Sequence, residues 1–188
     1  MRRKTFDWLL TAGGAMLTIV LIVAGIFLTL SANFANSNVH SQLAKQAIVV
    51  PAKGSPALAS PKIGPYLDRY AGQEVLSGPA AKAYADHFIA VHLSEMPYGG
   101  VYSKVSAAAQ KDPTNAKLKA LETTVFQGTT LRGLLLEAYA FSVFGEIASW
   151  ASIAVWVLAG IMLILTILGI VHFRRVSAEA ELLAPKTK

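Results

Sequence analysis

The sequence predicts an all-α integral membrane protein: a two-span helical hairpin, with both termini inside, that carries a small helical extracytoplasmic domain packed on the protruding ends of the spans. Two observations predict this fold. No charged residue occurs from Trp8 to Leu30, and none occurs from Ile147 to Val171. Each run exceeds the ~20 residues that an α-helix needs to cross a hydrocarbon core. The residues between the runs have mixed polarity, as expected of a water-exposed domain.

Basic residues predict the orientation of the hairpin. Arg2, Arg3 and Lys4 precede the first run, and Arg174 and Arg175 follow the second. Lys and Arg that flank a span are retained in the cytoplasm. We therefore expect a multi-pass protein of a bacterial plasma membrane, with these parts: cytoplasmic residues 1–7, a first transmembrane helix over 8–30, an extracytoplasmic domain over 31–146, a second transmembrane helix over 147–173 and a cytoplasmic tail over 174–188.

The first apolar run also invites interpretation as a cleaved signal peptide. A secretory core usually has 7–15 apolar residues followed by small residues at the cleavage site. Here the uncharged run is longer, and Ala32-Asn33-Phe34 is a poor cleavage pattern. We expect an uncleaved anchor.

Charge and cysteine content exclude several classes of function. The net charge is +6, and it divides evenly, because each flank and the outer segment contribute +2. No segment has the dense basic stripe that phosphate binding needs, so no nucleic-acid partner is expected. The chain has no cysteine, which excludes disulfides, attachment of haem through Cys-x-x-Cys-His, and thiolate sites for iron–sulfur clusters or zinc.

Prolines mark residues 44–65 as an extended loop, since Pro51, Pro56, Pro61 and Pro65 all disfavour helix. Residues 47–50 have a strand-like character within it. Two interpretations remain open: the loop lies on a surface of this chain or a partner, or it is a free linker.

Helical patterns fill the rest of the outer segment. We expect helices over 63–71, from a Ser77 cap to about Glu95, and over 102–111. Asp112-Pro113 predicts the start of a fourth short helix, which Gly128 interrupts. A new start at Thr129 or Thr130 then predicts a helix that continues to Arg174, whose first part stands outside the bilayer as a stalk.

The sequence offers no convincing catalytic, cofactor or metal site. His87 and His92 are five residues apart, a spacing that does not place two ligands on one helical face. Asp86 and His87 point about 100° apart on a helix, so adjacency does not orient the imidazole. Neither Ser103 nor Ser106 lies in a nucleophile elbow. We therefore expect a protein that is not an enzyme.

Two carboxylates and a set of apolar or small residues have other candidate roles. Glu137 and Glu146 are expected to be solvated at the membrane surface, with a proton-relay role as the alternative. Small residues one turn apart in the second span allow close helix approach, either to a partner or to the first span. Trp156 lies deep, without an obvious partner for its N–H, and suits packing on a protein neighbour or lipid. The candidate interface residues are Tyr84, Phe88, His92, Gly145, Ser149 and Trp156.

Three stretches carry a resemblance to a known family. They are IGPYLDRYAGQEVLSGPAAKAYADHFIAVHL, YSKVS and LRGLLLEAYAFSVFGEIA. Here the chain resembles a family of actinobacterial two-span membrane proteins, most of them uncharacterised, and is similar to an accessory protein of the cytochrome bcc–aa3 respiratory supercomplex. The resemblance implies a structural or assembly role beside redox subunits, without a cofactor of its own.

Three hypotheses for function follow. The first is a non-catalytic accessory, assembly or stabilising subunit, whose partners are membrane lipids and other integral membrane proteins, with respiratory oxidase and cytochrome bcc subunits as candidates. The second is an extracytoplasmic binding or envelope-tethering module anchored by two helices. The third, a membrane enzyme, needs a pocket with convergent titratable groups.

Overall fold

The computed structural model of the chain describes residues 3–176 and is all-helical over that range. Within it, the only pairing of extended residues is an isolated antiparallel bridge between Val49 and Glu74. The expected all-α class is thus confirmed. The predictions made for the first two residues and for the tail beyond residue 176 lie outside the described residues.

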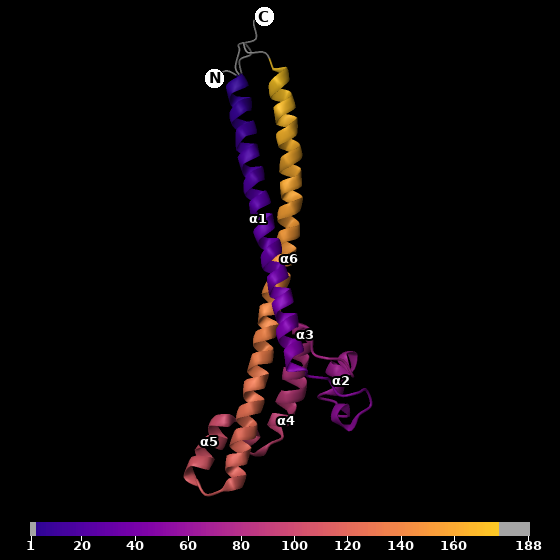
Figure 1. The fold of residues 1–188 in the computed structure, drawn as a ribbon, viewed down its shortest axis with the longest axis vertical. Helices are drawn as coiled ribbons and strands as arrows, with labels where there is room; N and C mark the ends of the chain where they lie inside the picture. Colours follow the sequence, from indigo (N-terminus) through magenta and orange to yellow (C-terminus); the bar gives the residue numbers. More distant parts are fainter. Residues whose placement is uncertain (1–2, 177–188) are drawn as a thin grey trace, which may run out of the picture. The chain divides into compact units, whose positions relative to one another are not determined.

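The chain divides into two compact units. The apolar unit contains residues 1–33 and 146–188, and the central unit contains residues 34–145. Helices α1 (Arg3–Gln46) and α6 (Ala116–Arg175) contribute to both units (Figure 1).

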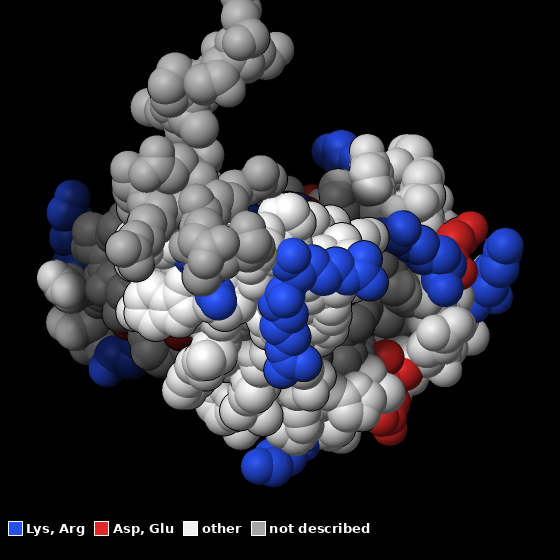
Figure 2. All heavy atoms as spheres, turned by 90° about the horizontal axis from the view of Figure 1, so that it is seen from above, with Lys and Arg blue, Asp and Glu red and all other residues white. Residues whose placement is uncertain are grey.

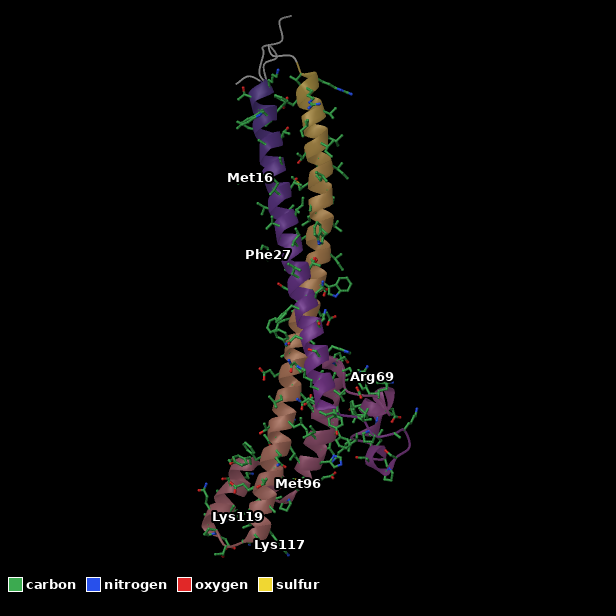
Figure 3. All side chains as sticks on the ribbon, in the orientation of Figure 1. Met16, Phe27, Arg69, Met96, Lys117 and Lys119 are labelled. Carbon is green, nitrogen blue, oxygen red and sulfur yellow. The ribbon has the colours of Figure 1, made fainter. Side chains whose placement is uncertain are left out.

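Both α1 and α6 are long and apolar enough to cross a membrane. Within the most apolar window of each helix, only 17% and 11% of the residues are buried. Met16 and Phe27, for example, are 70% and 66% exposed along α1 (Figure 3). A core helix of a water-soluble protein would bury such side chains, so these surfaces need an apolar surrounding.

The central unit contains a series of short helices between α1 and α6. Their order is η1 (Pro56–Leu58), α2 (Gly64–Leu67), η2 (Asp68–Tyr70), α3 (Gly78–Ala83), η3 (Tyr84–Ile89), α4 (Ala90–Ser94), η4 (Pro97–Gly100) and α5 (Tyr102–Lys111). The core holds six fully buried large side chains, those of Leu67, Leu135, Val50, Val75, Val105 and Val125. The helix expected over 63–71 is present as α2 and η2, the helix expected over 77–95 as α3, η3 and α4, and the helix expected over 102–111 as α5.

The proline-rich segment lies on the chain's own core, and the free-linker interpretation of it is wrong. Val50, Leu58 and Ile63 are at most 5% exposed. The backbone of Val50 also donates to the carbonyl of Gln73 and accepts from the amide of Gly72. Burial of these apolar side chains offsets the entropy of ordering a loop that lacks regular structure.

One predicted helix has an irregular centre. Ser77 caps α3 as expected, since its hydroxyl accepts from the amide of Ala80 at 3.4 Å. The helix then widens into η3, a π-helical turn, before α4 returns to α-helical geometry. Such turns occur frequently at functional sites.

The expected break at Gly128 is wrong. Helix α6 passes through Gly128 without interruption, so the predicted fourth short helix is the first part of α6. A mid-helix glycine costs only about 1 kcal/mol, and here it makes space: a Cβ would lie 2.9 Å from a methyl carbon of Leu93.

The predicted cap of this helix is also shifted. Asn115, three residues beyond Asp112, accepts from the amide of Leu118 at 3.2 Å. The Asp112 carboxylate instead accepts from the side chains of Thr114 and Asn115. The amide side chain therefore does the capping, and the aspartate orders the preceding turn.

Candidate interaction surface

Three of the candidate interface residues form an aromatic ladder on η3 and α4. The rings of Tyr84 and Phe88 stack with centroids 4.7 Å apart, and those of Phe88 and His92 lie 4.5 Å apart. His92 Nδ1 lies 2.7 Å from the carbonyl oxygen of Phe88, so this nitrogen carries the proton and donates it. Burial raises the pKa of the Tyr84 phenol. The sequence reasoning thus selected residues that the structure brings together.

The ladder forms one wall of a hollow of about 320 Å³. The opposite wall is the α6 stretch from Thr124 to Leu131, in which Gly128 leaves the space. An apolar hollow with a few polar groups at its edge is the usual form of a small recognition site.

An ion network ties η3 to α6. Asp86 accepts from Lys82 Nζ at 2.5 Å and from Arg132 Nη2 at 3.0 Å. These two cations, Lys82 foremost, hold the pKa of Asp86 below its usual range, and the Asp86 carboxylate in turn raises the pKa of Lys82. The sequence reasoning missed Arg132 because the pair spans 46 positions, although Lys82 and Asp86 have the i, i+4 spacing of a helical ion pair.

The network predicts a pH dependence of stability. The folded-state pKa of Asp86 is depressed, so its contribution is present above the unfolded value of about 3.9 and is lost as pH falls through the folded value. We expect Asp86→Asn to lower the melting temperature at pH 7, and the difference from wild type to shrink as the pH falls below about 4. Circular dichroism melts of the full chain in detergent, across pH 2–7, measure this difference. A difference that is constant with pH would contradict the assignment.

Asp86 and His87, which are neighbours in the sequence, contact different partners. Asp86 is engaged by the two cations, and the His87 ring stacks flat on the ring of Tyr66 at 3.5 Å. Across the described part of the chain, no group of three metal-ligating side chains comes together. The geometry therefore assembles no catalytic pair at Asp86 and His87.

Trp156 has the partner that the sequence did not reveal. Its indole N–H donates to Thr29 Oγ1 at 3.1 Å, and Thr29 also lies 2.7 Å from the hydroxyl of Ser152. A Cβ at Gly25 would lie 3.0 Å from the indole ring. The expectation of an N–H without a partner is therefore wrong, because Trp156 packs across the apolar unit from α6 to α1.

A second polar contact joins the same two helices. Thr18 and Thr166 are 4% and 7% exposed, and their hydroxyl oxygens lie 3.3 Å apart. Hydroxyl pairs and small residues of this kind are the usual means of helix association in lipid. In the apolar unit, the interpretation that small residues pair the two spans with each other is the one that fits.

The remaining candidates divide between packing and surface positions. Gly145 is buried in the central unit, where a Cβ would lie 2.8 Å from Asn36 Oδ1 and 3.0 Å from the Cβ of Ala35. Ser149 is half-buried on α6 of the apolar unit. Glu137 and Glu146 are exposed, as expected of solvated carboxylates.

The structure also shows an aromatic patch that the sequence reasoning missed. Tyr98, Val101, Tyr102 and Phe126 are between 40% and 53% exposed. The rings of Tyr102 and Phe126 lie against each other, with their centroids 5.5 Å apart. Tyr98 has a backbone φ of 61°, which residues other than glycine rarely adopt. The one signal for the patch in the sequence is the crowding of tyrosines around the Pro97–Gly100 turn.

The basic side chains on one face of the molecule lie at separate places. Figure 2 shows the Lys and Arg side chains at several separated places on the face viewed. Lys117 and Lys119 lie at the start of α6 (Figure 3), with Glu122 close by in sequence. On this face the described basic side chains are interrupted by other residues.

Comparison with known proteins finds no matching family model, no matching curated protein and no matching solved structure.

Proposed function

We propose that this chain is a non-catalytic accessory subunit that assembles with, or stabilises, a larger membrane complex. The observation that carries the proposal is the aromatic patch of Tyr98, Val101, Tyr102 and Phe126 on the central unit. Tyrosine-rich apolar clusters are typical hot spots of protein–protein contact, because they bury much area at low entropic cost.

Two further features support an accessory role. The apolar unit presents long uncovered apolar helix surfaces, which suit lipid and the spans of other membrane proteins. Asp86, the carboxylate next to His87 in the sequence, is used in a structural contact between Lys82 and Arg132. The actinobacterial cytochrome bcc–aa3 supercomplex is the candidate complex, on the sequence resemblance alone.

The proposed placement follows from the charges that flank the spans. Both ends of the hairpin lie in the cytoplasm and the central unit lies on the extracytoplasmic side of a bacterial plasma membrane. The aromatic patch then faces the extracytoplasmic domains of the partner complex.

Mild extraction of native membranes tests the proposal. We expect the tagged chain, solubilised in digitonin and separated by native electrophoresis, to migrate far above the 20.0 kDa of one chain and together with the cytochromes. Replacing Tyr102 and Phe126 together by alanine removes the centre of the patch and should release the chain from the complex. Tyr66→Ala is the matched control, because Tyr66 is 50% exposed but lies outside the patch.

Two results would contradict the proposal. One is migration of the wild-type chain only as a small species, with the cytochromes elsewhere in the gel. The other is equal loss from the complex with Tyr66→Ala and with the patch variant, which would show that general destabilisation is responsible.

A further inference from the structure

An open groove runs between α1 and α6 in the central unit. It has a volume of about 430 Å³ and an apolar floor formed by Val39, Leu43 and Leu135, which are all at most 5% exposed. Its walls carry large apolar side chains that remain uncovered, notably Leu134, which is 55% exposed. Uncovered apolar side chains around a groove suit contact with another protein segment.

The α1 wall of the groove is a row of amides. Asn38, Gln42 and Gln46 recur every four residues and line the groove together, which places them on one face of α1. A carboxamide both donates and accepts hydrogen bonds, so each can pair with an identical group. A row of charges of one sign could not meet its own copy in this way.

The groove is lined by one charged residue, Glu137 on α6. The exposed Lys45 lies outside the lining, about 20° around α1 from Asn38. Neither has an ion-pair partner within the part of the chain that the structure describes.

Lys45 and Glu137 lie at nearly the same level along the groove. Gly145 lies against Ala35 and Asn36, and the two helices run in opposite directions. Lys45 is nine residues beyond Asn36, and Glu137 is eight residues before Gly145. At 1.5 Å per residue, the two levels agree within about 2 Å.

We propose that the occupant is a second copy of this chain, which closes the groove into a four-helix bundle with two-fold symmetry. Both copies enter the membrane in the same direction, so the two-fold axis runs along the helices. Helix α1 of each copy then faces α6 of the other, and Lys45 of each meets Glu137 of the other. Gln42, at the centre of the amide row, lies next to its own copy at the axis.

Single cysteines test the arrangement, because the natural chain has none. We expect Gln42→Cys, in native membranes treated with copper phenanthroline, to form a disulfide-linked product of twice the 20.0 kDa chain mass. The control is Ala44→Cys, which is exposed but lies about 200° around α1 from Gln42. We expect it to cross-link at least about tenfold more slowly, at the level of random collision. Circular dichroism checks that both variants fold. Thiol labelling checks that the cysteine of each variant is accessible to reagent.

Charge reversal tests the cross-subunit pair in the Gln42→Cys background. We expect Lys45→Glu alone, and Glu137→Lys alone, each to lower the cross-linked yield by up to about fivefold, as an ion pair at a rim allows. The double variant restores opposite charges across the axis and should recover the yield. No ion pair within one chain involves either residue among the described residues, so the recovery reports on two chains.

Several results would overturn the proposal. They are equal cross-linking at positions 42 and 44, no cross-link at position 42 although its thiol is labelled, a product whose mass requires a different protein, or a double variant that is as impaired as the single ones. The proposal needs the common direction of insertion but no partner complex. Purified chain in lipid vesicles should therefore dimerise even if the accessory role is wrong.

Discussion

Leu135→Ala is expected to destabilise the central unit by about 2–5 kcal/mol, the usual cost of emptying a leucine-sized core position. Leu135 is 1% exposed and is one of the fully buried side chains of the core. The substitution leaves a cavity beside α1. Val39 and Leu43 are themselves buried, so they cannot move to fill it. Melting followed by circular dichroism in detergent should show a fall of roughly 10 °C or more.

Leu134→Ala is the matched control for this prediction. The two leucines are neighbours in α6, so the change in helix propensity is the same, but Leu134 is 55% exposed. Under conditions that leave one chain per micelle, we expect its cost to be below about 1 kcal/mol. An equal loss of stability at the two positions would show that the face of α6 assigned to the core is wrong.

Gly100→Ala is expected to be the most damaging small change in the turn between α4 and α5. Gly100 has φ +62°, and a Cβ there would lie 2.6 Å from the backbone carbonyl carbon of Leu93. The left-handed conformation costs an alanine about 1–2 kcal/mol, and the backbone clash adds an overpacking cost of about 1–3 kcal/mol. The melting temperature should fall accordingly, by roughly 10 °C or more.

Gly99→Ala separates these two causes. Gly99 has φ +65°, nearly the same conformation, but a Cβ there would meet nothing within 4 Å. We expect only the conformational cost, so Gly99→Ala should be clearly less destabilising than Gly100→Ala. If Gly99→Ala were the more destabilising of the two, the backbone conformation described for this turn would be wrong.

The features that could be predicted from sequence are those set by local pattern. Uncharged runs predict apolar helices, and they are found. Ser77 caps its helix because a hydroxyl beside the first turn satisfies amides that otherwise lack partners. The helix over 102–111 has the predicted bounds because it begins after a glycine turn and ends before Asp112.

The features that could not be predicted depend on which distant residues meet. Gly128 is a helix breaker by composition, but the Leu93 side chain uses the space that it leaves. Trp156 finds Thr29 only because the two helices pair. The Asp86–Arg132 contact likewise depends on how α6 packs against η3. Among the interface candidates, the ladder of Tyr84, Phe88 and His92 follows from helical spacing, whereas the exposed aromatic patch depends on the turn before α5.

The central claim is that both apolar helices cross a membrane and that the segment between them emerges on the outer side. Thiol labelling tests it most directly, because the chain has no cysteine of its own. Ser103→Cys and Thr5→Cys both place a thiol at an exposed position. With a membrane-impermeant maleimide on intact spheroplasts, we expect Ser103→Cys to be labelled at once, and Thr5→Cys to be labelled only after permeabilisation. Labelling of Thr5→Cys alone, or of both variants, in intact spheroplasts would contradict the account.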